Sequence, residues 1–102
     1  MSPPDRAGAD RAAALIPIDP PTHERATVVA DLAHSLMIRS RFGESMALAE
    51  AALAISRAVG AGPAETRALA ALGLDLAGRS DFERGIPMLR DGYELAHDAS
   101  VP

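Results

Sequence analysis

The tetrapeptide RSRF at residues 39–42 returns at residues 79–82 as RSDF, with one substitution and a shift of 40 residues. In both places it lies between two stretches in which apolar residues recur at helical spacing. A short polar segment between two amphipathic helices is typical of a helical hairpin. The duplication therefore predicts two hairpins, and because neither can bury its apolar face alone, we expect them to stack.

The repeat extends beyond the tetrapeptide. When residues 26–60 are placed over residues 66–100, six pairs are identical and others match in size. The positions that we expect to be structural are Leu32, Ala33, Leu36, Phe42 and Ala52 in the first copy, and Leu72, Gly73, Leu76, Phe82, Gly85 and Gly92 in the second.

For two groups among these positions we predict the structural environment. Phe42 and Phe82 are expected to be equivalent, each buried between the helices of its own repeat. Glycine inside a helix is unfavourable by roughly 1 kcal/mol. We therefore expect Gly73, Gly85 and Gly92 to lie where two helices approach closely.

The composition favours helices. Hydrophobic residues make up 48% of the 102 residues and aromatic residues only 3%, and most of the apolar residues are alanine and leucine. The length suits one small domain. We predict an all-α fold: two stacked antiparallel helical hairpins, a fragment of an α-solenoid, preceded by a short N-terminal helix.

The chain divides into three predicted segments. Residues 1–22 form a flexible N-terminus with a short helix at 10–17 and a proline-rich link, residues 23–62 the first repeat, and residues 63–102 the second. Within the repeats we expect helices at 23–40, 44–59 and 63–77, and a fourth after residue 80.

Several residues predict where these helices begin and end. Thr22 is expected to be the N-cap of the first, and Gly78 the C-cap that ends the third. Ser80 with Glu83 has the spacing of a capping box for the fourth. Because proline disrupts a helix interior, the fourth helix either kinks at Pro87 or begins its regular part there.

Composition and spacing also exclude several functions. The net charge is −4 without a basic run, and there is no cysteine, so we expect neither nucleic-acid binding nor thiolate chemistry. The N-terminus lacks the pattern of a signal peptide, and no apolar run reaches the roughly 18 residues that span a membrane. The histidines lack metal-ligand spacing, and no Gly-x-Ser-x-Gly motif occurs. We expect a cytoplasmic protein that is not an enzyme, with no catalytic residue, metal or cofactor.

The repeat resembles the tetratricopeptide repeat. That family pairs a large with a small residue in the first helix, here Leu32-Ala33 and Leu72-Gly73, and places an aromatic residue after the turn, here Phe42 and Phe82. This chain departs from the family in its period, 40 residues instead of about 34. The resemblance implies a non-enzymatic module for protein–protein interaction.

A narrower resemblance concerns LIPIDPPTHERATVVADLAHSLMIRSRF at residues 15–42 and ALAEAALAISRAVGAGPAETRALAALGLDLA at residues 47–77. These stretches are similar to the helical arm of LuxR-type transcriptional regulators with an AAA-type ATPase domain. The chain has no phosphate-binding loop ending in Gly-Lys-Ser/Thr, since it has no lysine. The resemblance implies a part, or a relative, of the sensing arm. The alternative function is small-molecule effector sensing coupled to an ATPase.

The first helices of both repeats are expected to line a groove for a protein partner, which is a peptide, a helix or the same chain. Its predicted residues are Ala30, His34, Met37 and Ile38, continued by Ala70, Leu74 and Ala77. We also expect the fourth helix to stay partly exposed through Met88 and Leu95. The chain should therefore form homo-oligomers or dock onto other domains of a longer regulator.

Overall fold

The computed structural model describes residues 21–100 of the chain. In this range the protein forms four α-helices and no β-strand: α2 (His23–Ile38), α3 (Phe42–Val59), α4 (Gly62–Gly78) and α5 (Phe82–Ser100). The predicted all-α fold is confirmed for this part of the chain. The predicted helix at residues 10–17 lies outside the described residues.

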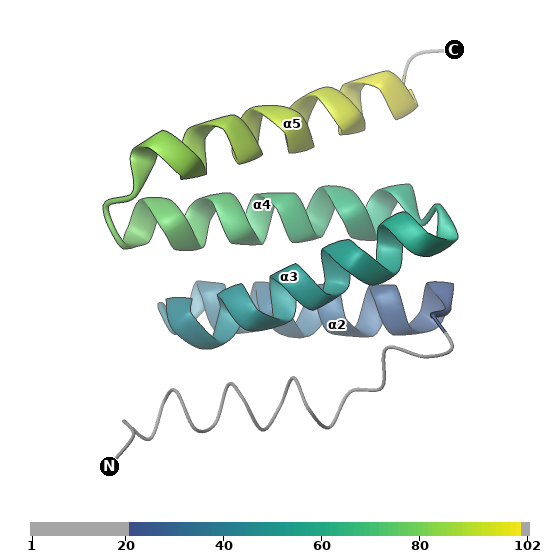
Figure 1. The fold of residues 1–102 in the computed structure, drawn as a ribbon, viewed down its shortest axis with the longest axis horizontal. Helices are drawn as coiled ribbons and strands as arrows, with labels where there is room; N and C mark the ends of the chain where they lie inside the picture. Colours follow the sequence, from purple (N-terminus) through teal and green to yellow (C-terminus); the bar gives the residue numbers. More distant parts are fainter. Residues whose placement is uncertain (1–20, 101–102) are drawn as a thin grey trace.

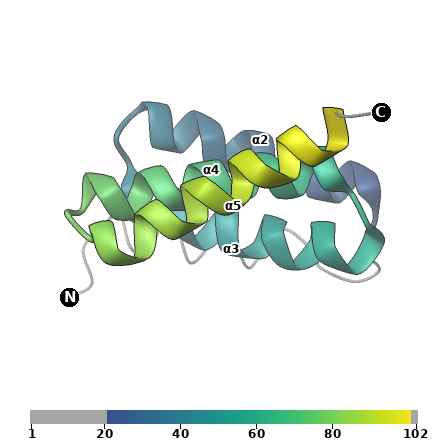
Figure 2. The same cartoon turned by 90° about the horizontal axis from the view of Figure 1, so that it is seen from above.

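The four helices form two antiparallel hairpins that lie side by side (Figure 1). α2 packs against α3, and α4 packs against α5. The hairpins meet where α4 contacts both α2 and α3. Among the described helices α5 contacts α4 alone, and it lies across α4 when the molecule is turned (Figure 2). The second hairpin is therefore covered by the first on one side only.

The repeated tetrapeptide forms the turn inside each hairpin. Ser40 and Ser80 both have a left-handed backbone, with φ of 61° and 66°. The Ser40 N–H donates to the Met37 carbonyl and the Arg41 N–H to the Leu36 carbonyl, both at 2.9 Å. The second turn repeats these bonds at 2.9 and 2.8 Å. This is a Schellman ending, which satisfies carbonyls left open at the end of a helix. The duplicated sequence thus encodes one helix-ending turn twice.

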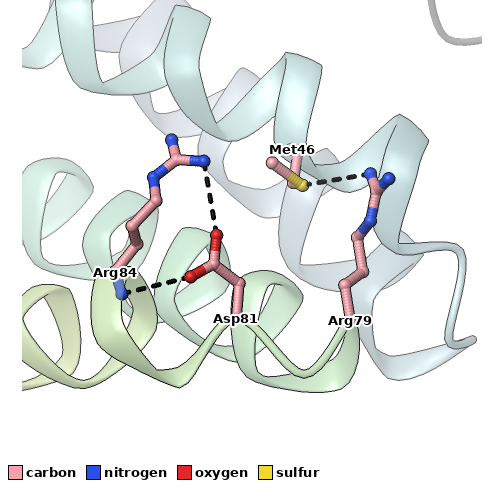
Figure 3. Close-up of polar contacts among 4 residues, drawn as sticks. All are labelled: Met46, Arg79, Asp81 and Arg84. Carbon is pink, nitrogen blue, oxygen red and sulfur yellow. Dashed lines mark hydrogen bonds and ion pairs between the residues drawn. The ribbon is translucent and has the colours of Figure 1, made fainter.

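The second turn corrects the predicted start of α5. Asp81, not Ser80, directly precedes the helix, and its Oδ1 accepts a hydrogen bond from the Arg84 N–H at 3.4 Å (Figure 3). The Arg84 guanidinium pairs with the same carboxylate at 3.5 Å. Ser80 cannot be the cap because its left-handed backbone belongs to the ending of α4. From the same turn, Arg79 donates to Sδ of Met46 on α3 at 3.6 Å, which links the two hairpins.

Other predicted helix boundaries had mixed outcomes. The cap at Thr22 is confirmed, because its Oγ1 accepts from the Arg25 N–H at 3.1 Å. The prediction that Gly78 is the C-cap of the third helix is wrong, since Gly78 is still helical as the last residue of α4 and Arg79 is the C-cap. α5 continues through Pro87, so its regular part does not begin there.

The core consists mainly of small side chains. Alanine predominates because the helices approach closely, and only a few branched residues fill the remaining space. The largest fully buried apolar side chains are Leu48, Ile55 and Val29, and Leu76 is almost as buried. The repeat positions Ala33, Ala52, Leu72 and Gly73 are also buried, and Leu36 packs against the core while half-buried.

The three glycines of the second repeat lie at the contact between α4 and α5. A Cβ atom added to Gly73 would lie 2.7 Å from Cγ of Leu89, and one added to Gly85 would lie 2.8 Å from the Gly73 carbonyl oxygen. At Gly92 the nearest atom is Cβ of Leu69 at 3.3 Å. These distances explain glycine in a helix interior, since a side chain at either of the first two would push the helices apart.

The two phenylalanines are not equivalent in burial, contrary to the prediction. Phe42 is half-buried, and a Cβ atom added to Gly78 would lie 2.6 Å from its ring, so Phe42 packs on the next hairpin. Phe82 is 55% exposed, because no described helix follows α5 to cover it. Leu32 and Leu72 also differ in burial: Leu32 of α2 is 42% exposed, whereas Leu72 is buried on α4, which contacts the other three described helices.

Candidate partner-binding site

A pocket of about 500 Å³ is bounded by α2, α4 and α5. It is lined by His34 of α2, by Gly62, Pro63, Thr66, Arg67 and Ala70 of α4, and by Leu95, Ala96 and Ala99 of α5. Most of these residues are apolar or glycine. The polar side chains are His34, Thr66 and Arg67. A partly open pocket of this kind suits an apolar group that carries a few polar atoms at its edge.

The local sequence explains why α4 begins beside this pocket. Gly60 is the C-cap of α3 and adopts a left-handed φ of 69°. The N–H of Ala61 then closes the turn by donating to the Ser56 carbonyl at 2.9 Å. Pro63 stands in the first turn of α4, where its missing N–H is not needed. Because α5 runs antiparallel to α4, the last turns of α5 reach the first turns of α4.

An ion pair defines one edge of the pocket. Nη1 of Arg67 donates to Oδ1 of Asp31 at 2.8 Å, which joins α4 to α2. Both side chains are about half exposed, so the pair contributes at most about 1 kcal/mol to stability. An anionic group entering the pocket would have to compete with Asp31 for the guanidinium.

The pocket coincides only in part with the groove predicted from the sequence. His34 and Ala70 line it. Ala30 is fully buried, so its place in the predicted groove was wrong: α2 turns this residue into the core. The remaining predicted groove residues lie outside the pocket lining. They are Met37, Ile38, Leu74 and Ala77, of which Ile38 and Leu74 are well exposed and the other two half-buried.

Sequence reasoning missed the contribution of α5. Leu95, Ala96 and Ala99 lie far from α2 in the sequence, and nothing in their spacing marks them as a pocket wall. They take part because of the angle at which α5 lies across α4, which depends on the close approach at the packing glycines. One sequence feature could have indicated the pocket: the residues around Pro63 at the start of α4 are small, and small side chains leave space beside a helix.

A buried carboxyl group lies elsewhere, on α4. Asp75 is fully buried, and neither of its oxygens has a hydrogen-bond partner within the described part of the chain. Burial raises the pKa of Asp75 from 3.8 to about 6, and the nearby Ser45 hydroxyl opposes this rise. The Ser45 hydroxyl lowers the pKa only a little, because it donates its hydrogen bond to the Ala33 carbonyl at 2.9 Å. Its place in the apolar stripe of α4, three residues after Leu72, was the available sequence signal.

The described residues contain no cluster of three or more histidine or acidic side chains that could hold a metal ion. No helix in the same part of the chain is both long and apolar enough to cross a membrane.

Comparison with known proteins gave no match to this chain among protein-family models, curated proteins or solved structures.

Proposed function

We propose that this chain is a non-enzymatic helical-repeat module that binds another protein through the pocket between α2, α4 and α5. The observation that carries the proposal is the pocket itself. It has a volume of about 500 Å³, a largely apolar lining and polar side chains from only three residues. Such a surface can accept an apolar side chain from a peptide or helix and hold it in register through a few polar contacts.

The same proposal includes a relationship to the tetratricopeptide repeat and to the sensing arm of LuxR-type regulators. Its support is the 40-residue sequence repeat, and the two hairpins are in keeping with it. We further propose that the protein acts in the cytoplasm and that its module forms oligomers or docks onto other domains of a regulator.

The second candidate function is the sensing of a small effector. The volume of the pocket favours it, because small-molecule pockets range from about 300 to 1,000 Å³. The guanidinium of Arg67 and the imidazole of His34 would then contact the polar part of the effector. The two functions predict different ligands for one pocket.

A peptide library displayed on phage tests the proposal. We expect selected peptides to share one apolar anchor residue and to lose binding to the Ala96→Arg variant, which places a charged side chain at the pocket wall. Ala54→Arg is the matched control, because Ala54 is exposed on α3 and does not line the pocket. Peptides that bind both variants equally would refute the proposal. A small-molecule fragment that binds the wild type and is lost in Ala96→Arg, without any selected peptide, would favour the effector.

A further inference from the structure

An apolar stripe runs along α5 on a side that no described helix covers. Phe82 is 55% exposed, Ile86 49% and Tyr93 72%. Their spacing of four and then seven residues places all three on one face of the helix. Met88 and Leu95 are half-buried, which agrees with the expectation that they stay partly exposed. The stripe is distinct from the pocket, whose α5 residues are Leu95, Ala96 and Ala99.

The equivalent residues of the first repeat indicate what kind of element packs on such a stripe. Forty residues earlier, its members correspond to Phe42, Met46 and Leu53 of α3, all of which are half-buried. The ring of Phe42 lies against Gly78, and Sδ of Met46 accepts from Arg79 at 3.6 Å. This face of α3 is therefore the one on which α4, the next helix of the array, packs. The equivalent face of α5 has the same kind of side chains without such a helix.

The contact between α3 and α4 also indicates which residues a helix needs in order to pack on the α5 stripe. α4 packs on α3 closely enough that a Cβ atom at Gly78 would lie 2.6 Å from the ring of Phe42. The other buried residues of α4 include three alanines, Ala64, Ala68 and Ala71, beside the larger Leu69, Leu72, Asp75 and Leu76. A helix that covers the α5 stripe in the same way must therefore present a glycine or alanine where it meets the ring of Phe82.

A second copy of this chain does not meet that requirement. Its α2 would take the place that α4 takes on α3. In α2, however, Ile38 stands at the position of Gly78, and Val28 at that of Ala68. Even one carbon atom at Gly78 would come within 2.6 Å of the phenylalanine ring, so with the larger side chain of Ile38 there the ring would have to leave the position in which it packs.

We infer that the stripe Phe82, Ile86 and Tyr93 is a docking surface for an α-helix of a partner protein that presents a glycine or alanine to the Phe82 ring, as α4 presents Gly78 to Phe42. The inference rests on the proposal that the chain is an interaction module, but it uses a surface separate from the pocket. It therefore makes the module bivalent, with one site for an apolar side chain and another for a helix.

The chain provides its own probe for a test. A synthetic peptide of residues 62–78, GPAETRALAALGLDLAG, presents the face of α4 and contains no aromatic residue. Tyr93 is the single tyrosine of a chain without tryptophan, so tyrosine emission of the protein reports directly on the stripe. We expect the peptide to change this emission saturably. We also expect a peptide with Gly78→Ile, which resembles α2 at this position, to bind about tenfold or more weakly.

Protein variants separate this surface from the pocket. Ile86→Asp should weaken peptide binding about tenfold or more, and Ile86→Ser should do so without adding a charge. Ala54→Asp on α3 and the pocket variant Ala96→Arg should both bind like the wild type. Circular dichroism checks that each variant is folded.

Four results would overturn the inference. They are absence of peptide binding, equal binding by Ile86→Asp, loss of binding in Ala96→Arg, and self-association of the wild type that Ile86→Asp abolishes. The third would place the peptide in the pocket and leave the proposed function standing. The fourth would identify a second copy as the occupant.

Discussion

Replacing Asp75 by asparagine should stabilise the protein, and the gain should depend on pH. In the folded protein the carboxyl group is fully buried without a hydrogen-bond partner among the described residues, and its pKa rises from 3.8 to about 6. The folded state therefore holds the proton more tightly than the unfolded state. Stability consequently falls as pH rises from about 4 to about 6, and the penalty is complete above the folded pKa.

The magnitude follows from the shift. A difference of about 2 pKa units, at about 1.4 kcal/mol per unit, corresponds to roughly 3 kcal/mol at neutral pH. About 1 kcal/mol of this penalty is already present at pH 4.5, because the unfolded state is then largely ionised. Asparagine does not titrate. The difference in unfolding free energy between Asp75→Asn and the wild type should therefore grow by about 2 kcal/mol from pH 4.5 to pH 7.

Urea denaturation followed by circular dichroism at several pH values measures this difference. Its change with pH is the informative quantity, because any constant effect of the amide on packing cancels. Asp91→Asn is the matched control, since it makes the same substitution at an exposed site on α5, where burial adds no dependence on pH. A difference for Asp75→Asn that is equally flat would refute the reasoning. It would mean that the folded protein solvates the carboxylate, for example by turning the Ser45 hydroxyl toward it.

Other substitutions test the packing and the turns, with thermal or urea unfolding as the measurement. Phe42→Ala should cost about 2–3 kcal/mol because it removes the contact with α4, whereas Phe82→Ala should cost less than about 1 kcal/mol; equal losses would contradict the difference in burial. Gly85→Ala should destabilise by about 1–3 kcal/mol, since its Cβ would lie 2.8 Å from a backbone oxygen; unchanged stability would mean that the helices separate freely. Ser80→Gly should stabilise by about 0.5–1 kcal/mol by relieving a left-handed backbone, and no gain would place the strain elsewhere. Pro87→Ala should stabilise by about 1–3 kcal/mol by restoring a backbone donor inside α5, and unchanged stability would mean that proline costs the helix nothing at this position.

The sequence predicted the fold class and the order of the helices because both depend on local patterns. Helical periodicity, the Thr22 cap and the repeated turn are each encoded within a few consecutive residues. The errors at Gly78 and Ser80 have a physical reason. Glycine usually ends a helix by adopting a left-handed backbone, but here Ser80 takes that conformation, and Gly78 makes room for the ring of Phe42.

The candidate site was less predictable because it depends on distances between helices. His34 and Ala70 were found from the repeat geometry, whereas Leu95, Ala96 and Ala99 join them only through the way α5 lies across α4. Asp75 illustrates the same limit. Its position in the apolar stripe was visible in the sequence. Its lack of a hydrogen-bond partner was not, because it arises from the Ser45 hydroxyl, which donates to the Ala33 carbonyl instead.

A repeat encodes a position in an array, and the environment of that position depends on the neighbouring copy. Phe42 and Phe82 occupy the same position, yet one packs on α4 and the other is exposed. The exposed member is nevertheless aromatic, and Ile86 beside it is apolar, although polar side chains at these exposed positions would make the protein more soluble. Small two-hairpin units gain stability when their end faces are covered. A helix bound to α5 would therefore stabilise the second hairpin as well as dock on it. If the partner helix binds as we infer, saturating peptide should raise the unfolding midpoint of the wild type and leave that of Ile86→Asp unchanged.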